Sequence, residues 1–143
     1  MEKKCAALSG EIANLTRPDA AGFAQLFDSM MDRAYSWPLW GAAYVINGGC
    51  SDDSFSDFRA SLISRGRTAF DRALNDPDSL ADEDLDEGTW FFEGYQYAVT
   101  DAVKAVTGAT PPRAQSHPKA PSGEEWDEAN VYDRYPRLRQ KYA

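Results

Sequence analysis

Apolar side chains recur at helical spacing over long stretches of the chain, and this periodicity constrains the fold more than any other feature. Counting from Phe23, apolar residues fall 3, 4, 7, 8, 11 and 12 positions further on, which is one face of an α-helix. Thr16 is placed to cap this helix, and Pro18 and Asp19 follow in its first turn. The spacing therefore predicts a helix over residues 16–35.

Residues 39–46 form a short apolar run, which predicts an element that is buried on all sides. A run of this length is also compatible with a β-strand. Its small residues at 41–43 and its mere two β-branched residues favour a helix of about ten residues. Pro38 suits the first turn of this helix, and Gly48–Gly49 is a strong stop signal.

The stretch NGGCSDDSFSDFR, residues 47–59, combines two glycines, a cysteine and three aspartates. Ser51 is a good N-cap, and Asp52 and Asp53 lie in the first turn after it, where the helix dipole favours carboxylates. From Phe55 to Leu74 apolar residues keep helical spacing for some twenty residues. The stretch is therefore predicted to be a corner between two helices, in preference to a nucleophile or a metal site.

The second half of the chain predicts one further helix, a linker and a tail. The helix covers residues 89–108 and ends at a glycine, and the Pro-rich residues 109–125 are typical of an extended linker. Residues 126–143 begin with Trp126 as an apolar anchor and contain a short helix. We expect an all-α single domain of four to five helices (residues 1–108), a linker (109–125) and a C-terminal tail (126–143) packed over the domain.

The net charge of −8 is concentrated in one segment, residues 76–103, which carries nine acidic side chains and no basic one. We call this segment the acidic belt. A surface of this sign repels phosphate backbones, which argues against nucleic acid as a partner. A basic protein, a cation or the chain's own basic tail would suit it, and a solvated acidic loop is the alternative without a partner.

The sequence predicts a cytoplasmic protein without a membrane partner. No apolar run approaches the roughly 18–20 residues that span a bilayer. The first residues have a basic pair but no continuous apolar segment, which argues against a secretory signal. Two cysteines are too few for a disulfide framework.

Few residues are suited to catalysis. His117 is the only histidine and lies in the linker, which disfavours most histidine-dependent and zinc schemes. Cys50 precedes a predicted helix, but the nearby Asp52 and Asp53 oppose a thiolate, so we interpret it as a structural thiol. We therefore assign no catalytic residue, no metal site and no cofactor, and the sequence does not favour an enzyme.

Arg59 lies on or beside the apolar stripe of its predicted helix, four residues after Phe55 and three before Leu62. A buried guanidinium needs a partner, because an unpaired buried charge is very costly. Asp52 or a carboxylate of another helix would supply a structural ion pair. The alternative is an arginine at the floor of an anion-binding pocket.

The segment WPLWGAAYVINGGCSDDSFSDFRASLISRGRTAFDRALNDPDSLAD, residues 37–82, resembles the bacterial domain-of-unknown-function family numbered 4240. The shared pattern is Trp-x-Leu-Trp-Gly-Ala-Ala-Tyr, then Ile-Asn-Gly-Gly-Cys-Ser-Asp-Asp, Phe-x-x-Phe-Arg and Pro-Asp-Ser-Leu-Ala. The C-terminal EEWDEANVYDRYPRL is similar to the closing segment of the family. Weaker similarity covers most of residues 20–138.

The chain departs from this family at three points. Pro38 stands where an Asp is usual, Ser61 stands where a Trp is usual, and the family's leading Phe–Trp helix has no counterpart. These differences imply altered packing or a surface exposed to a partner. The resemblance implies no activity, because the family has no settled function.

Two functions remain open. The first is a binding or regulatory module that acts through protein contacts, motivated by the acidic belt and by aromatic residues off the core stripe, Trp90 and Tyr97. These two would form a partner surface or pack under the tail. The second is a small-molecule-binding protein or small enzyme, whose pocket would be formed by Trp40, Tyr44, Asn47, Asp52, Asp53 and Arg59. An open cavity between Tyr44 and Arg59 would support the second function.

Overall fold

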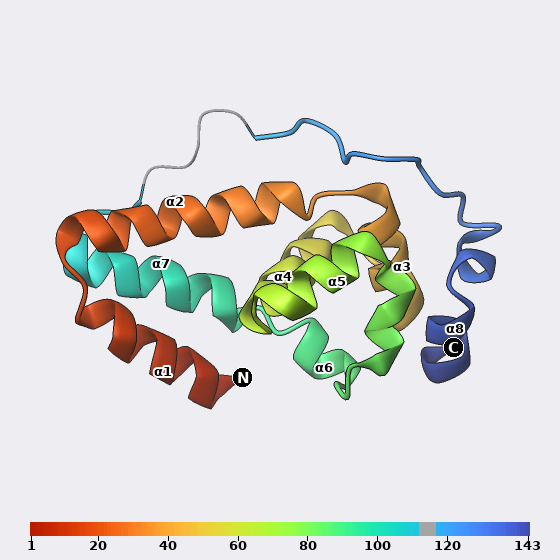
Figure 1. The fold of residues 1–143 in the computed structure, drawn as a ribbon, viewed down its shortest axis with the longest axis horizontal. Coiled ribbons are helices and arrows are strands. Elements are labelled where there is room, and N and C mark those ends of the chain that lie inside the picture. The colour runs from red at the N-terminus through yellow and green to blue at the C-terminus, as the bar shows by residue number, and fades with distance from the viewer. Residues whose placement is uncertain (112–116) are drawn as a thin grey trace.

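The computed structural model describes residues 1–111 and 117–143, and every regular element in these ranges is helical. Eight α-helices and two short 3-10 helices are present there (Figure 1). They are α1 (Glu2–Ala13), α2 (Arg17–Arg33), α3 (Trp37–Asn47), α4 (Asp52–Ser64), α5 (Arg67–Asn75), η1 (Pro77–Asp82), α6 (Glu87–Trp90), α7 (Gly94–Thr107), η2 (Val131–Arg134) and α8 (Pro136–Tyr142). The all-α prediction is confirmed, and the predicted number of four to five helices is too low.

The predicted number of helices is too low for three reasons. α1 lies outside the predicted helices, and Ile12 is its one fully buried residue. The predicted helix of some twenty residues after Ser51 is divided into α4 and α5, because Gly66 between them has a φ of +98°. An L-residue rarely adopts this conformation, whereas glycine does so without steric cost. The predicted helix 89–108 is also divided, since α6 ends at Trp90 and α7 starts at Gly94.

The predicted helix starts are confirmed where a cap was assigned. The hydroxyls of Thr16 and Ser51 each accept a hydrogen bond from the amide three residues on, at 3.3 and 3.2 Å. Ser36 caps α3 in the same way, and Gly48 ends that helix in the left-handed region with a φ of +68°. Residues 39–46 are therefore helical, as favoured over a strand.

Helices α1, α2 and α7 lie side by side at one end of the molecule (Figure 1). The N-terminal half of α2 packs on the C-terminal half of α7, and the C-terminal half of α2 packs on the start of α7, so the two helices are antiparallel. The buried residues of these contacts are Ala20, Ala24, Ala102 and Val103 in one cluster and Phe27, Met31, Ala60, Tyr95 and Val99 in the next.

The remaining helices surround a larger core at the other end. Its largest fully buried side chains include Phe55 and Phe58 of α4, Phe70 of α5 and Trp90 of α6. α4 joins the two ends, because Ala60 on the same helix belongs to the cluster of α2 and α7. α3 contributes an almost entirely buried helix, as its apolar sequence predicts.

The C-terminal tail crosses back over this larger core. Residues 117–122 run along the C-terminal end of α2 (Figure 1), where Ser122 donates its amide to the carbonyl of Tyr35 and accepts from the amide of Trp37. α8 then packs on η1 and α3, with Leu138 fully buried. The last helix of the chain thus contacts elements that lie about sixty to one hundred residues earlier.

Candidate functional site

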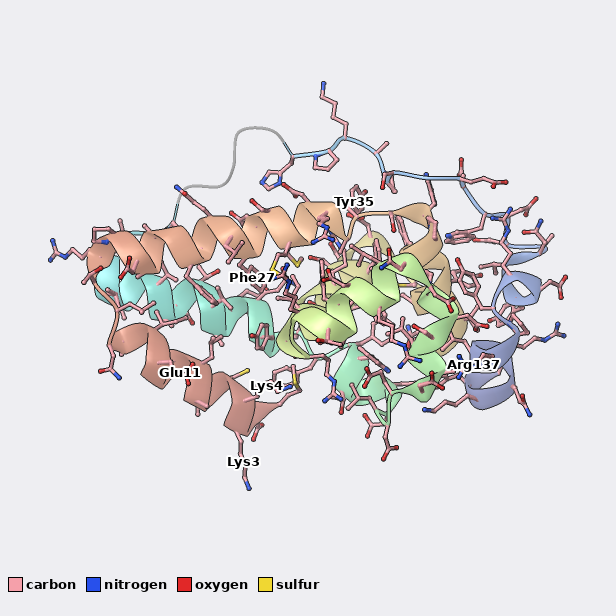
Figure 2. All side chains as sticks on the ribbon, in the orientation of Figure 1. Lys3, Lys4, Glu11, Phe27, Tyr35 and Arg137 are labelled. Carbon is pink, nitrogen blue, oxygen red and sulfur yellow. The ribbon has the colours of Figure 1, made fainter. Side chains whose placement is uncertain are left out.

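A groove with a volume of about 740 Å³ lies between α2, α4 and α7. Its floor includes the buried side chains of Phe27 and Met31 from α2 and Val99 from α7. Figure 2 shows Phe27 on the side of α2 that faces the neighbouring helices, and Tyr35 near the extended segment 117–122. His117 and Pro118 form one edge of the groove.

Six carboxylates line this groove, and we call it the acidic groove. They come from three segments of the chain: Asp28 and Asp32 on α2, Asp52, Asp53 and Asp57 on α4, and Glu93 just before α7. Arg59 is the one lysine or arginine among the lining residues of the described chain. The local charge is therefore strongly negative, although this site lies mostly outside the acidic belt.

Arg59 holds α4 against α2 at the base of the groove. Its side chain is buried, and Nη1 donates to the backbone carbonyl of Met31 at 2.7 Å. The guanidinium also lies over the rings of Tyr35 and Phe55, with 4.7 and 4.9 Å between its carbon and the ring centroids. Met31 lies in the last turn of α2, where carbonyls lack intrahelical donors and the helix dipole favours a cation. Arg59 therefore caps the C-terminal end of α2 from another helix.

Two of the groove carboxylates are held by neutral side chains. Asp52 accepts from the hydroxyl of Tyr35 at 3.3 Å, and Asp57 accepts from the amide of Gln96 at 3.0 Å. Burial raises the pKa of Asp57, the bond from Gln96 opposes that rise, and the nearby carboxylates Glu93 and Asp53 add to it. The pKa of Asp57 thus lies above that of an ordinary aspartate.

The other four carboxylates differ in how they are compensated. Asp32 lies 2.7 Å from Nδ1 of His117, which ties the extended segment to α2. The side-chain carboxylates of Asp28, Asp53 and Glu93 have no hydrogen bond or ion pair within residues 1–111 and 117–143.

The sequence analysis assigned six residues to a ligand pocket, and the structure brings three of them to the groove. These are Asp52, Asp53 and Arg59. The sequence analysis did not assign Asp28, Asp32, Asp57 and Glu93 to the site. For the first three, the sequence contains a signal in the spacing of the like charges. Asp28 and Asp32 are four residues apart on α2, as are Asp53 and Asp57 on α4, and like charges at this spacing destabilise a helix.

The other three residues have structural contacts elsewhere. Trp40 stacks on Phe55 with 5.0 Å between the ring centroids and donates Nε1 to the carbonyl of Cys50 at 2.9 Å. Tyr44 packs against Trp126 of the tail, and Asn47 donates to the carbonyl of Gly49 at the helix corner. Phe55 thus contacts Trp40 on one side and the guanidinium of Arg59 at 4.9 Å.

Cys50 lies at the helix corner and packs against the larger core. Burial raises the pKa of its thiol to about 12, and a hydrogen bond with Trp40 only partly opposes that rise. Asp52 raises it further, while Arg59 lowers it. A thiol with this pKa is a poor nucleophile at neutral pH.

The two aromatic residues assigned to a partner surface lie in different environments. Trp90 is fully buried and cannot form a contact surface; its Nε1 donates to the hydroxyl of Tyr142 at 3.4 Å. Packing under the tail, the other interpretation of this residue, agrees with that contact. Tyr97 is 66% exposed and lies at the edge of the acidic groove.

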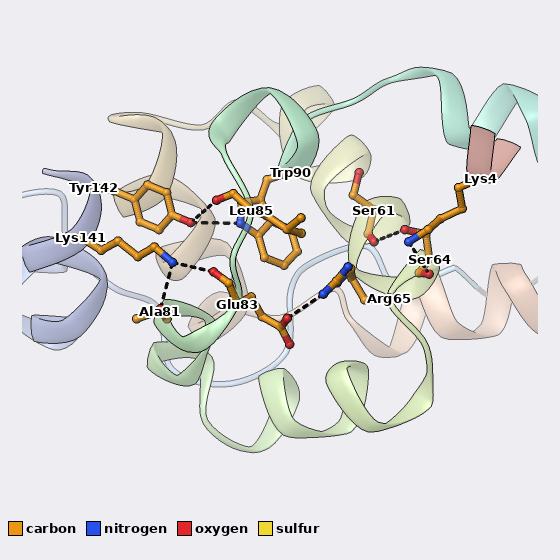
Figure 3. A network of polar contacts seen from close by, with 10 residues as sticks. All are labelled: Lys4, Ser61, Ser64, Arg65, Ala81, Glu83, Leu85, Trp90, Lys141 and Tyr142. Carbon is orange, nitrogen blue, oxygen red and sulfur yellow. Dashed lines mark hydrogen bonds and ion pairs between the residues drawn. The ribbon is translucent and has the colours of Figure 1, made fainter. Parts of the chain in front are cut away.

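Part of the acidic belt is occupied by basic groups of the same chain. Asp82 pairs with Arg72 and with Arg137, whose side chain extends from α8 toward η1 (Figure 2). Glu83 pairs with Arg65 at 3.0 Å, and Lys141 donates to the backbone carbonyls of residues 81 and 83 (Figure 3). The start of the belt thus has intramolecular partners.

The described residues contain no group of three His, Cys, Asp or Glu side chains that could hold a metal ion. None of the helices in residues 1–111 and 117–143 is both long and apolar enough to cross a bilayer.

The comparisons with known proteins agree with the resemblance found in the sequence. The family model of DUF4240, a protein of unknown function, matches residues 1–105, which include α1 to α6 and most of α7. All six groove carboxylates lie in the matched part. No curated protein and no solved structure matches the chain. The chain belongs to DUF4240, a family of proteins of unknown function.

Proposed function

We propose that the protein is a cytoplasmic binding module that receives a basic segment of another protein in the acidic groove. The observation that carries this proposal is the charge of the groove, where six carboxylates face one guanidinium. A cleft lined by one sign of charge attracts partners of the opposite sign and raises their association rate. Lysine and arginine side chains are the protein groups with that charge.

The distribution of the carboxylates supports an extended partner. They come from α2, α4 and the segment before α7, so they follow the walls of the groove and do not converge on one small ligand. The repeated like-charge spacing on α2 and α4 costs each helix a few tenths of a kcal/mol. A bound basic segment would offset that cost.

Tyr97 supports the same proposal from the rim of the groove. The side chain of Tyr97 is largely exposed, and Glu93, four residues earlier in the chain, also lines the groove. Guanidinium groups stack favourably on exposed aromatic rings. A basic segment can thus combine ion pairs with a stacking contact.

The small-molecule alternative is less well supported, because Trp40, Tyr44 and Asn47 lie away from the groove. The division into a domain (1–108), a linker (109–125) and a tail (126–143) is part of the proposal, with the groove placed in the domain. The tail does not line the groove within the described residues.

The proposal is tested with fluorescein-labelled peptides of alternating Lys and Arg, six residues long, and fluorescence anisotropy. The variant pair is D53N/E93Q, which removes two exposed groove charges that have no hydrogen-bonded partner in the described chain. The matched control is D84N/E87Q, which makes the same changes at exposed positions outside the groove. We expect the groove variant to lose affinity about tenfold more than the control at low salt.

A binding loss that is equal in the two variants would attribute the affinity to net charge and contradict the groove. An acidic peptide of the same length serves as the partner control and is expected not to bind. Competition by spermidine as efficiently as by the peptide would favour a small cation over a protein segment. Binding should weaken as the salt concentration rises, because the contacts are largely exposed.

A further inference from the structure

The second feature that resembles a binding site is the surface under the tail. We call it the tail face and define it by Trp37–Tyr44 on α3, η1 and Leu85. The tail, residues 126–143, supplies the other half of each contact described next. This surface is separate from the acidic groove.

An aromatic pocket on α3 receives the start of the tail. Trp126 stands edge-on to Trp37 and Trp40, with 5.9 and 6.5 Å between the ring centroids, and packs on Tyr44 at 5.0 Å. Gly41 makes this approach possible, since a Cβ there would lie 2.9 Å from the Trp126 ring and 2.5 Å from the Tyr135 hydroxyl. The pocket is therefore shaped for aromatic side chains.

Polar groups of η1 and the residues after it bind the end of the tail. The carboxylate of Asp78 accepts from the backbone amides of Arg137 and Leu138 at 3.2 and 3.0 Å and so caps α8. The hydroxyl of Tyr142 donates to the carbonyl of Leu85 at 2.7 Å (Figure 3). Leu138 is fully buried between these contacts.

These contacts form a complete recognition surface for a short linear segment. They supply aromatic anchors, a buried leucine, a helix cap and carbonyl acceptors for Lys141, which are the elements that peptide-binding proteins use. The segment before Trp126 is tied to the domain by backbone bonds of Ser122 to Tyr35 and Trp37 and by the contact of His117 with Asp32. The side-chain contacts with the tail face are therefore made by the tail and not by the linker.

The length of the linker determines whether the tail face binds the chain's own tail or the tail of a second copy. A linked segment has an effective concentration of about millimolar, so the chain's own tail outcompetes a second copy at micromolar concentration. Gly108 follows the half of α7 that packs on the start of α2, whereas Trp126 packs on α3, which comes after the end of α2. The two ends of the linker are therefore separated by roughly the length of α2, about 25 Å. The seventeen residues of the linker reach about 50 Å when extended, so they span this distance with ease.

We propose that the tail face is a peptide-docking site that accepts the tail of a second copy of this chain when the chain's own tail cannot reach it. Removal of residues 109–121 leaves five Cα steps between Gly108 and Trp126, at most about 18 Å. This is shorter than α2. The shortened chain should exchange tails with a second copy and form a closed dimer.

The experiment measures molar mass by light scattering, with circular dichroism to verify the helical content. We expect the shortened chain to have twice the mass of the full chain. Its matched control replaces residues 109–121 by thirteen Gly and Ser residues and should have the mass of the full chain. The shortened chain with Leu138→Asp should also have that mass, because its tail no longer docks. A shortened chain that is helical and has the mass of the full chain overturns the proposal.

A second measurement decides the question if the shortened chain does not fold. A protease site is inserted between residues 119 and 120 of the full chain, which is then cut after folding. A labelled synthetic peptide of residues 122–143 should displace the cut tail and enter the complex, and the same peptide with Leu138→Asp should not. Failure of the labelled peptide to enter under native conditions overturns the proposal.

Discussion

Arg59 donates from Nη1 to the backbone carbonyl of Met31 at 2.7 Å and thereby joins α4 to the last turn of α2. This contact gives a buried arginine on an apolar stripe a structural role. The charged donor lies where the carbonyls of a helix end need one. A carboxylate partner for Arg59 stays a prediction.

The Arg59 contact predicts a clear loss of stability in Arg59→Met. The apolar replacement fills the space but leaves the Met31 carbonyl without its charged donor, which costs about 1.5–3 kcal/mol. Arg67→Met is the control, since the Arg67 side chain is 93% exposed and should change the free energy of unfolding by less than about 0.5 kcal/mol. Urea unfolding of both variants measures the difference, and equal small losses would contradict the capping role.

The Cys50 thiol should react slowly in the folded protein. Because burial raises its pKa to about 12, the thiolate is scarce at pH 8. We expect alkylation by iodoacetamide to be at least tenfold slower in the native chain than in urea, with Cys5→Ala used to isolate the Cys50 signal. Rapid native alkylation would restore the nucleophile interpretation. Cys50→Ala should lower stability only modestly.

The buried phenol of Tyr135 should make the protein less stable at alkaline pH. Burial raises the pKa of its phenol from 10.0 to about 12, so the folded chain holds this proton more tightly than the unfolded chain. This contribution is complete below about pH 10 and is lost as the pH rises toward 12. Tyr135→Phe should lose about 1 kcal/mol at pH 7, because the phenol donates to the carbonyl of Pro38, and should decline less steeply above pH 10. Parallel unfolding curves for the two chains across this range would contradict the assignment.

The tail should stabilise the domain mainly through apolar contacts. Leu138→Ala removes a fully buried side chain and should cost about 2–5 kcal/mol. Charge reversal of Arg134 and Arg139 should have little effect, because they form exposed ion pairs with Glu124 of the linker and Asp133 of the tail and not with the domain.

Charge reversal of Arg137, which pairs with Asp82, should lower the stability of the domain at low salt only, because salt screens an exposed ion pair. Removal of residues 110–143 should expose Trp90, whose fluorescence then shifts to longer wavelength. A truncated chain that melts like the full one would show that the tail contacts do not contribute.

Adding a single methyl group at Gly41 should lower the stability of the protein clearly. Gly41→Ala brings a Cβ within 2.9 Å of Trp126 and should cost about 1–3 kcal/mol as α3 and the tail move apart. Gly22 lies in α2 and has nothing within 4 Å of the same position. Gly22→Ala should therefore stabilise the chain by up to about 1 kcal/mol. Thermal unfolding distinguishes the two, and a gain in both would exclude close packing at Gly41.

Local patterns predicted the helices that have both a cap and an apolar face. Thr16, Ser36 and Ser51 are followed by such faces, and each of them starts a helix. The break at Gly66 was not predicted, because the helical spacing of apolar residues continues across it and periodicity alone does not reveal the break. α1 has neither a capping side chain nor a wide apolar face, and its packing on α7 determines it.

The site was harder to predict, because it depends on which helix faces meet. Asp52 and Asp53 were found through their role at a helix start, and Arg59 through its departure from the apolar stripe. Asp28 and Asp32 lie on another helix, and only the packing of α2 against α4 and α7 brings them to the same groove. Trp40 and Tyr44 share their helix with no groove residue, since that helix faces the tail.

The contact between Tyr135 and Pro38 has a consequence for how the chain folds. The two residues are 97 positions apart, so closing that loop costs about 4 kcal/mol of chain entropy before any contact compensates for it. Until Tyr135 and Leu138 have been synthesised and have docked, the aromatic side of α3 stays open to water and to other chains. The docking of these two residues therefore determines when this surface of a growing molecule stops being prone to aggregation.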